Sequence, residues 1–199
     1  MRTRIFLASS NAGKLREYRQ LAAGSPFEID LLPDFANLPE FDESAPTFAE
    51  NSAGKALHYS RFSDQMVLAD DSGLVVPALG GAPGVHSARY AGLNATGADR
   101  VAKLLREMAG KSGPERRAHF VCVISLARCG RAMAVVSDRA DGWIASEPRG
   151  AGGFGYDPIF LFPDGLRTYA EATPDEKNAA SHRGKAFCRL LTHLQSVNN

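Results

Sequence analysis

Two adjacent carboxylates, Asp70 and Asp71, follow a short apolar run at residues 66–69 and precede Ser72 and Gly73. Neighbouring like charges repel each other, so the pair needs either water or a cation close by. Asp-Asp-Ser-Gly is a good turn sequence, and a solvated turn at the end of a strand is one explanation. The other is a hard cation held at the carboxyl end of that strand, where open α/β sheets bind ligands.

Mg²⁺ is the cation that this interpretation favours. It prefers oxygen ligands and is typically held by one or two carboxylates together with substrate phosphates. A further carboxylate could come from Asp42 or Glu43, in the long acidic loop expected at residues 33–46. The spacing does not choose between these two residues.

A helix is expected after this loop, from Thr47 to about residue 62, because Thr47 and Glu50 fit a capping box. Asn51, Lys55 and Tyr59 recur every four residues and therefore share one face of it. A mixed polar face of this kind is usually solvated. The alternative is that Lys55 projects toward a phosphate near the aspartate pair.

The segment Ser9-Ser10-Asn11-Ala12-Gly13-Lys14 joins an expected strand at residues 4–8 to an expected helix at residues 14–23. A loop that enters a helix N-terminus presents backbone N–H groups and the positive end of the helix dipole, which together favour phosphate. It is not a Walker A loop, which requires GxxxxGK[ST]. A solvated turn that caps the helix is the other explanation.

A glycine-rich stretch at residues 150–157 includes Phe154, Gly155, Tyr156 and Asp157. Glycines permit close backbone approach to a ligand, Phe154 could stack on a flat base, and Asp157 could accept hydrogen bonds from ring N–H groups. A glycine-rich hairpin with core aromatics explains the stretch about as well.

Three basic residues near the C-terminus, Lys177, His182 and Arg183, could add donors to such a base pocket. Arg183 falls in the first turn of a helix expected from Ser181 to about residue 195, where the helix dipole disfavours a cation. This position suggests an anionic or acceptor-rich partner for Arg183. A basic helix start facing water is the alternative.

Strands and helices mix along the chain without strict alternation, which predicts an α/β or α+β fold with a mixed sheet in a single domain, residues 1–199. Further expected elements are a strand at residues 27–32, a strand at 66–69 that ends at the aspartate pair, a helix at 96–109, a β-hairpin at 118–140 around Cys129-Gly130, and a short strand at 159–162.

The composition is that of a globular protein, with 44% hydrophobic and 23% charged residues. The net charge of +1 gives no general attraction to nucleic acid. No apolar run approaches transmembrane length, and three cysteines without a CxxC pair are typical of reduced thiols. We therefore expect a cytoplasmic protein with no membrane or nucleic-acid partner.

The ordered set of motifs closely resembles the inosine triphosphate pyrophosphatase (HAM1-like) family, over nearly the whole chain. The motifs are the loop at residues 10–14, Thr47-Phe48-x-Glu50-Asn51 with Lys55, Asp70-Asp71-Ser72-Gly73-Leu74, Gly81-x-Pro83-Gly84 with Ser87-Ala88-Arg89-Tyr90, Gly153-Phe154-Gly155-Tyr156-Asp157-Pro158 and Ser181-His182-Arg183-Gly184.

The resemblance implies a homodimeric, Mg²⁺-dependent hydrolase that cuts ITP, dITP and XTP between the α- and β-phosphates. It also implies a long mixed sheet flanked by helices in two lobes, with the nucleotide in the cleft between them. Asp71 would bind the metal and accept the proton of the attacking water, Asp42 or Glu43 would supply a second metal carboxylate, and Ser72 would contact the substrate.

Further residues would bind the nucleotide if the resemblance holds. The phosphates would be bound by Ser9, Ser10, Asn11, Ala12, Gly13, Lys14 and Lys55, and the base by Phe154, Gly155, Tyr156, Asp157, Lys177, His182 and Arg183. Two alternatives remain open: a Maf-like pyrophosphatase acting on pyrimidine triphosphates, and a nucleotide-binding protein without catalysis. The Ser-His-Arg and Gly-Phe-Gly-Tyr-Asp-Pro segments argue against the first, and the intact aspartate pair and lysines argue against the second.

Overall fold

The computed structural model describes residues 2–197. Six strands form one sheet in the order β2-β1-β3-β4-β5-β6. The strands are β1 Thr3–Leu7, β2 Phe27–Leu31, β3 Met66–Val75, β4 Arg117–Arg128, β5 Arg131–Ile144 and β6 Phe160–Leu161. The α-helices of the described residues are α1 Ala12–Leu21, α2 Phe48–Tyr59, α3 Gly97–Glu107, α4 Pro174–Ala180 and α5 His182–Val197.

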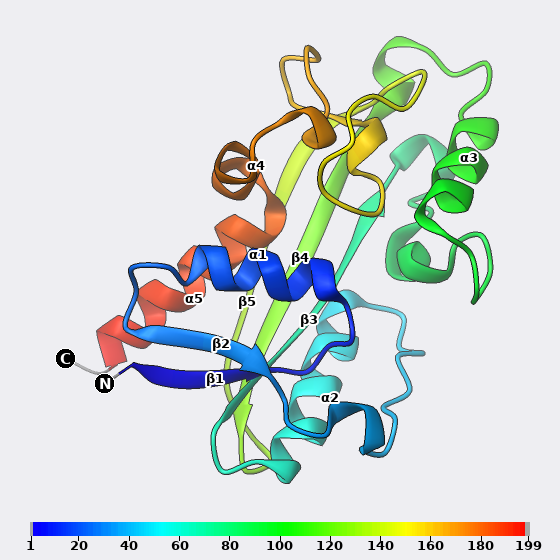
Figure 1. The fold of residues 1–199 in the computed structure, drawn as a ribbon. Coiled ribbons are helices and arrows are strands. Elements are labelled where there is room, and N and C mark those ends of the chain that lie inside the picture. The colour runs from blue at the N-terminus through cyan, green and yellow to red at the C-terminus, as the bar shows by residue number, and fades with distance from the viewer. Residues whose placement is uncertain (1, 198–199) are drawn as a thin grey trace. The chain divides into compact units, whose positions relative to one another are not determined.

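The expected mixed α/β class is confirmed. β1 pairs in parallel with β2 and with β3, and the first of these pairs lies side by side in Figure 1. β5 pairs with β6 in the antiparallel sense. The two-residue turn at Cys129-Gly130 joins β4 to β5, and both of its residues have positive φ (48° and 73°), as in a type I′ hairpin turn. The predicted hairpin is therefore present, although β5 runs four residues beyond its expected end at residue 140.

The chain groups into two compact units. The first contains the described residues up to Asp71, Cys122–Asp138, and those from Arg183 onward; the second contains Ser72–Val121 and Arg139–His182. Strands β3, β4 and β5 each contribute residues to both units.

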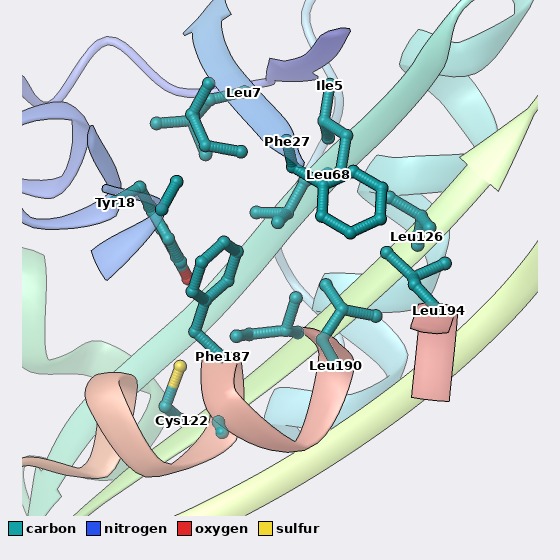
Figure 2. Packing of buried hydrophobic residues seen from close by; sticks show 14 residues of the cluster. Ile5, Leu7, Tyr18, Phe27, Leu68, Cys122, Leu126, Phe187, Leu190 and Leu194 are labelled. Atoms are coloured by element: carbon teal, nitrogen blue, oxygen red, sulfur yellow. The ribbon is translucent and has the colours of Figure 1, made fainter. Parts of the chain in front are cut away.

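Strand side chains of the first unit alternate between two cores, as the pleat of a β-strand requires. One core is formed with α1 and α5, and Figure 2 shows it: it includes Ile5, Leu7, Leu68, Leu126, Tyr18, Phe187 and Leu190. The other core is formed with α2 and includes Ala8, Val67, Ala69, Ala127, Ala56 and Tyr59. Even-numbered residues of β3 before the aspartate pair therefore face α1 and α5, and odd-numbered ones face α2.

The second unit has its own core. It is built from the parts of β3, β4 and β5 that belong to this unit, from α3 and from the segment around β6. It includes Leu74, Val101, Leu104, Phe120, Ile144, Ile159, Phe160 and Tyr169. α3 follows its N-cap residue Thr96, which forms a capping box with Asp99, and so begins close to the expected start at residue 96.

Two predicted boundaries near the aspartate pair are wrong. β3 does not end at Ala69 but continues through Asp70 and Asp71 to Val75, so neither the turn nor the strand-end placement is correct. α1 begins at Ala12 and not at Lys14, because the side chain of Asn11 caps it by accepting hydrogen bonds from the backbone N–H groups of Gly13 and Lys14.

Candidate active site

The aspartate pair lies where the direction of chain progression across the sheet reverses. From β1 the chain forms β2 on one side and β3 on the other. Leu7 is the last residue of β1 and pairs with Leu68, while β3 continues past it. Asp70 and Asp71 therefore lie just beyond the carboxyl end of β1, at the kind of reversal where open α/β sheets bind ligands.

Alternation along β3 sends the two carboxylates to opposite faces of the sheet. Asp70 has the parity of Leu68 and meets residues of α1 and α5, and Asp71 has the parity of Ala69 and meets residues of α2. The sheet thus lies between the two negative charges, which is how adjacent aspartates are accommodated without a turn.

Asp70 is fully buried and is held by two cations. Its Oδ1 lies 2.8 Å from Nζ of Lys14, and its Oδ2 accepts a hydrogen bond of 3.2 Å from Nε of Arg183. Nη1 of the same guanidinium donates to Glu17 at 2.6 Å. Burial alone would raise the pKa of Asp70, but the charges of Lys14 and Arg183 outweigh it and hold the pKa well below its usual range.

The partner predicted for Arg183 is therefore anionic, and it belongs to the chain itself. Two carboxylates, those of Asp70 and Glu17, surround a guanidinium that is only 2% exposed. The placement of Arg183 in the first turn of α5, which the dipole disfavours, is compensated by these two charges. Glu17 was missed by the sequence analysis, although a glutamate one helical turn beyond Lys14, next to the core residue Tyr18, is a signal of a buried ion pair.

Asp71 faces a more open and more finely balanced environment. Its Oδ2 accepts a hydrogen bond of 3.1 Å from Nδ2 of Asn51. Burial raises the pKa of this carboxyl above its ordinary value, against the lowering charges of Lys14 and Lys55. A carboxylate with a raised pKa, one oxygen of which is already oriented, is suited to accept a proton.

The face of α2 that carries Asn51, Lys55 and Tyr59 is buried, so its interpretation as a solvated face is wrong. A segment from the loop before α2, residues 39–45, covers it. Nζ of Lys55 lies 2.9 Å from Oε1 of Glu43, and Asn51 exchanges two hydrogen bonds with the backbone of Ala45. We call residues 39–45 the acidic segment.

The two candidate metal ligands, Asp42 and Glu43, both belong to the acidic segment but have different surroundings. Glu43 is half-buried, pairs with Lys55 and raises the pKa of Asp71 through its charge. Asp42 is exposed and accepts a hydrogen bond from the hydroxyl of Ser44. No cluster of three or more His, Cys, Asp or Glu residues suited to a metal occurs among residues 2–197. Asp71 and one carboxylate of the acidic segment would nonetheless suit Mg²⁺, which binds carboxylate oxygens and commonly takes its remaining ligands from water and phosphate.

The loop before α1 is shorter than predicted. Ser9 accepts a hydrogen bond from the N–H of Asn11, while Ala12, Gly13 and Lys14 belong to the first turn of the helix. The side chain of Asn11 already binds the N–H groups of Gly13 and Lys14, two of the donors expected to face a phosphate. Ser10, Asn11 and Ala12 are exposed at this helix N-terminus.

In the second unit, the glycine-rich stretch is tied to α4. Oδ2 of Asp157 accepts a hydrogen bond from the N–H of Phe154 and lies 2.5 Å from Nζ of Lys177. The ammonium group of Lys177 lies 4.8 Å from the ring centroid of Phe154, a cation–π distance. Gly153 must lack a side chain, because a Cβ there would overlap the Asp157 carboxylate. Phe154, Asp157 and Lys177 thus form one connected cluster.

The other predicted base-pocket residues make separate contacts. His182 is 4% exposed and stacks on Phe120 at 4.6 Å between ring centroids. Tyr156 belongs to the core of the second unit and donates a hydrogen bond of 3.0 Å from its hydroxyl to the carbonyl of Ser87. Gly155 has a positive φ of 65°, and Ser72 follows Asp71 within β3.

An α/β sheet with carboxylates and lysines at a chain reversal has them at the place where open α/β sheets bind ligands, and carboxylates of this kind are typical ligands of Mg²⁺. Residues 5–193 match the Ham1 family. The chain is 51% identical to a dITP/XTP pyrophosphatase of Geobacillus kaustophilus over 97% of its own length and 95% of that protein. A HAM1 protein of Coxiella burnetii superposes with a TM-score of 0.85 at 43% identity, covering 98% and 99% of the two chains. The Ham1 protein of Staphylococcus aureus superposes with a TM-score of 0.84 at 34% identity over the same shares.

The chain belongs to the Ham1 family. The resemblance noted in the sequence is therefore confirmed. The described residues contain no helix that is long and apolar enough to cross a membrane.

Proposed function

We propose that this protein hydrolyses dITP, ITP and XTP to the corresponding monophosphate and pyrophosphate. The observation that carries the proposal is the environment of Asp71 in a member of the Ham1 family: Asn51 orients the carboxylate, and Lys14 and Lys55 supply positive charge near it. The relative from Geobacillus kaustophilus bears the name dITP/XTP pyrophosphatase, which supports two of these substrates, dITP and XTP.

Asp71 is the group that orients the attacking water and takes its proton. Phosphoanhydride hydrolysis depends on positioning and on charge neutralisation more than on covalent chemistry. Lys14 and Lys55, with the exposed N-terminus of α1 at residues 9–14, neutralise and hold the phosphates. Lys14 is fixed for this task by its ion pair with Asp70.

Mg²⁺ is the cofactor we propose, held by Asp71 and Glu43. Its contribution is to neutralise phosphate charge and to lower the pKa of a bound water. Of the two acidic candidates we choose Glu43, because it is half-buried beside Lys55 whereas Asp42 is exposed. Arg183 does not contact substrate in this proposal: it holds Asp70 and Glu17 in place.

The base is recognised by Phe154, Gly155, Asp157, Lys177 and His182, and Ser72 contacts the substrate next to Asp71. Hypoxanthine and xanthine carry a 6-oxo acceptor where adenine carries a 6-amino donor. A fixed donor such as the Lys177 ammonium would be left unmatched by the amine of adenine, and unmatched buried polar groups give large discrimination. The buried pair of Lys177 with Asp157 keeps this donor in place.

The test is a pyrophosphate-release assay over dITP, ITP, XTP, GTP, ATP and UTP, each with Mg²⁺ and with a chelator. We expect turnover of the first three nucleotides that is abolished by the chelator and is at least a hundredfold faster than turnover of ATP and UTP. Preferential turnover of UTP would support a pyrimidine-specific enzyme, and no turnover of any nucleotide would refute the proposal.

A homodimer and a cytoplasmic location belong to the same proposal. Met133 and Val135, two residues apart on β5, expose 45% and 53% of their surface and supply an apolar strip for a second copy. The cysteines Cys122, Cys129 and Cys188 are all free, as in reducing compartments. Light scattering should give twice the chain mass, and Val135→Lys should reduce it to that of one chain. Wild-type protein at one chain mass would refute the dimer.

A further inference from the structure

The acidic segment lies on α2 in a regular register. Every second residue of the segment contacts the helix, and from Phe41 onward each contact falls one helical turn from the next. Pro39 O is 2.8 Å from Nε2 of His58, the N–H of Phe41 donates to the Tyr59 hydroxyl at 3.2 Å, Glu43 binds Lys55 at 2.9 Å, and Ala45 and Asn51 exchange two hydrogen bonds. The segment therefore runs antiparallel to the helix.

This register decides which carboxylate faces Lys55. Odd-numbered residues from 41 to 45 are half-buried against α2, and even-numbered residues from 40 to 46 are exposed. Two residues of extended chain rise about 6.6 Å and one helical turn about 5.4 Å, so the two periodicities match closely over this length. A shift of one residue would exchange Glu43 for Asp42.

The contact of Phe41 with α2 depends on a glycine in the helix. Gly54 lies in the middle of α2, and a Cβ built on it would overlap the Cζ atom of the Phe41 ring. Its backbone is helical, so no turn requires a glycine, and glycine is the least favourable ordinary residue in a helix interior. Phe41 also contacts the His58 ring, at 5.8 Å between centroids. The ring is thus enclosed between two α2 residues one turn apart.

We propose that Gly54 is a positioning residue: the space above it receives the Phe41 ring and thereby fixes the acidic segment in the register that places Glu43 against Lys55 near Asp71. Phe41 is two residues before Glu43, so displacement of its ring moves the backbone that carries this carboxylate. The inference rests on the proposed function for its catalytic consequence, and on the contacts alone for the role of Gly54.

The competing explanation is that glycine at position 54 is simply tolerated. It predicts that Gly54→Ala stabilises the protein, because alanine is a better helix former, with a rise in Tm of about 2–4 °C for a chain of this size. It also predicts unchanged kinetics. The two explanations therefore differ in whether Gly54→Ala raises Tm and in whether it lowers kcat.

The experiment is a double-mutant cycle of Gly54→Ala and Phe41→Ala. Tm is measured without metal or nucleotide, and kcat and KM are measured for dITP with Mg²⁺. In the wild-type background we expect Gly54→Ala to lower kcat tenfold or more, to change KM by less than threefold, and not to raise Tm. In the Phe41→Ala background, where the methyl group has room, the same substitution should change kcat less than twofold and should raise Tm.

A matched control and a rescue variant complete the design. Gly97→Ala adds the same methyl group to another helical glycine, at which a Cβ meets only ordinary contacts, and should leave kcat unchanged. Phe41→Leu in the Gly54→Ala protein should restore kcat at least fivefold, since the shorter side chain avoids the added methyl group. An unchanged kcat in Gly54→Ala, or an equal loss of kcat in both backgrounds, would overturn the proposal.

Failure of the proposed function would look different. If the wild-type protein released no pyrophosphate from dITP, that function would be refuted. The Tm cycle would still report whether the Phe41 ring occupies the space above Gly54. Additive Tm changes would then refute the inference independently of any activity.

Discussion

Asp70 and Asp71 are chemically identical neighbours whose surroundings give them opposite properties. Asp70 is enclosed by Lys14 and Arg183, and its pKa is held low. Asp71 accepts a hydrogen bond from the side-chain amide of Asn51, and burial raises its pKa. The first is suited to hold cationic side chains and the second to exchange a proton.

Asp71→Asn should lower kcat for dITP by about 10²–10⁴-fold, which is the usual contribution of a general base. The amide keeps the size of the side chain but cannot accept the proton of water. Tm should stay within a few degrees of the wild type, because the carboxylate gains little from its surroundings. Full activity in Asp71→Asn would mean that another group is the base.

Asp70→Asn is the matched control at the neighbouring position. This substitution leaves Arg183 and Lys14 short of a buried counter-charge, and the loss of one partner of a buried pair costs about 3–5 kcal/mol. We therefore expect a clear fall in the free energy of unfolding, measured by urea denaturation. If Asp70→Asn proved as stable as Asp71→Asn, the distinction between the two carboxylates would be wrong.

Glu43→Gln and Asp42→Asn test the register of the acidic segment. Glu43 lies 2.9 Å from Lys55, whereas Asp42 is exposed and bonded to Ser44. Glu43→Gln should weaken Mg²⁺ binding, so that the Mg²⁺ concentration that gives half-maximal turnover rises at least tenfold. Asp42→Asn should change it less than twofold, and the reverse result would assign the ligand to Asp42.

At the scale of elements, the β4–β5 turn contains the clearest local strain. Cys129 has a φ of 48°, in a region that non-glycine residues rarely adopt but asparagine adopts most readily. Cys129→Asn should therefore raise the free energy of unfolding by about 0.5–1 kcal/mol in urea denaturation. Cys188→Asn, at an exposed position within α5, should give no such gain. A destabilised Cys129→Asn protein would show that the thiol contact with Ser63 outweighs the strain.

Local signals predicted the elements well because their causes are local. The cap at Thr47 and the Cys129-Gly130 turn both lie at the predicted places. The end of β3 was wrong because Asp-Asp-Ser-Gly is turn-like by composition, whereas partners on both faces of the sheet keep it extended.

The site itself was only partly predictable, because its decisive contacts join distant segments. Nothing near Asn51 or Lys55 indicates that the acidic segment covers them, so their face was interpreted as solvated. The partners of Arg183 lie 113 and 166 residues away, at Asp70 and Glu17. Sequence reasoning suggested an anionic or acceptor-rich partner for Arg183 but could not identify it.

At the scale of the whole molecule, the chain passes between its two units four times, at Asp71/Ser72, Val121/Cys122, Asp138/Arg139 and His182/Arg183. Neither unit is one continuous segment, and three strands contribute to both. We therefore expect thermal unfolding in a single transition, with equal calorimetric and van't Hoff enthalpies. This measurement also tests the single-domain prediction, and two resolved transitions would contradict it.

A cavity in the core of either unit should lower the temperature of this single transition. Phe187→Ala removes a fully buried ring from the core with α1 and α5, and Phe160→Ala removes one from the core of the second unit. Each should cost about 3–5 kcal/mol and shift the whole melting curve. A curve in which only part of the amplitude shifts would indicate independent units.

The alternation of β3 also limits how this stretch of chain can change. Inserting or deleting one residue in β3 before Asp70 would turn every following side chain to the opposite face, and would exchange the occupants of the two sides. The carboxylate that now balances buried cations would face the helix of Lys55, and its neighbour would enter the apolar interior beside Tyr18. Single-residue length variation is therefore excluded here, whereas conservative replacement of one apolar residue by another is tolerated.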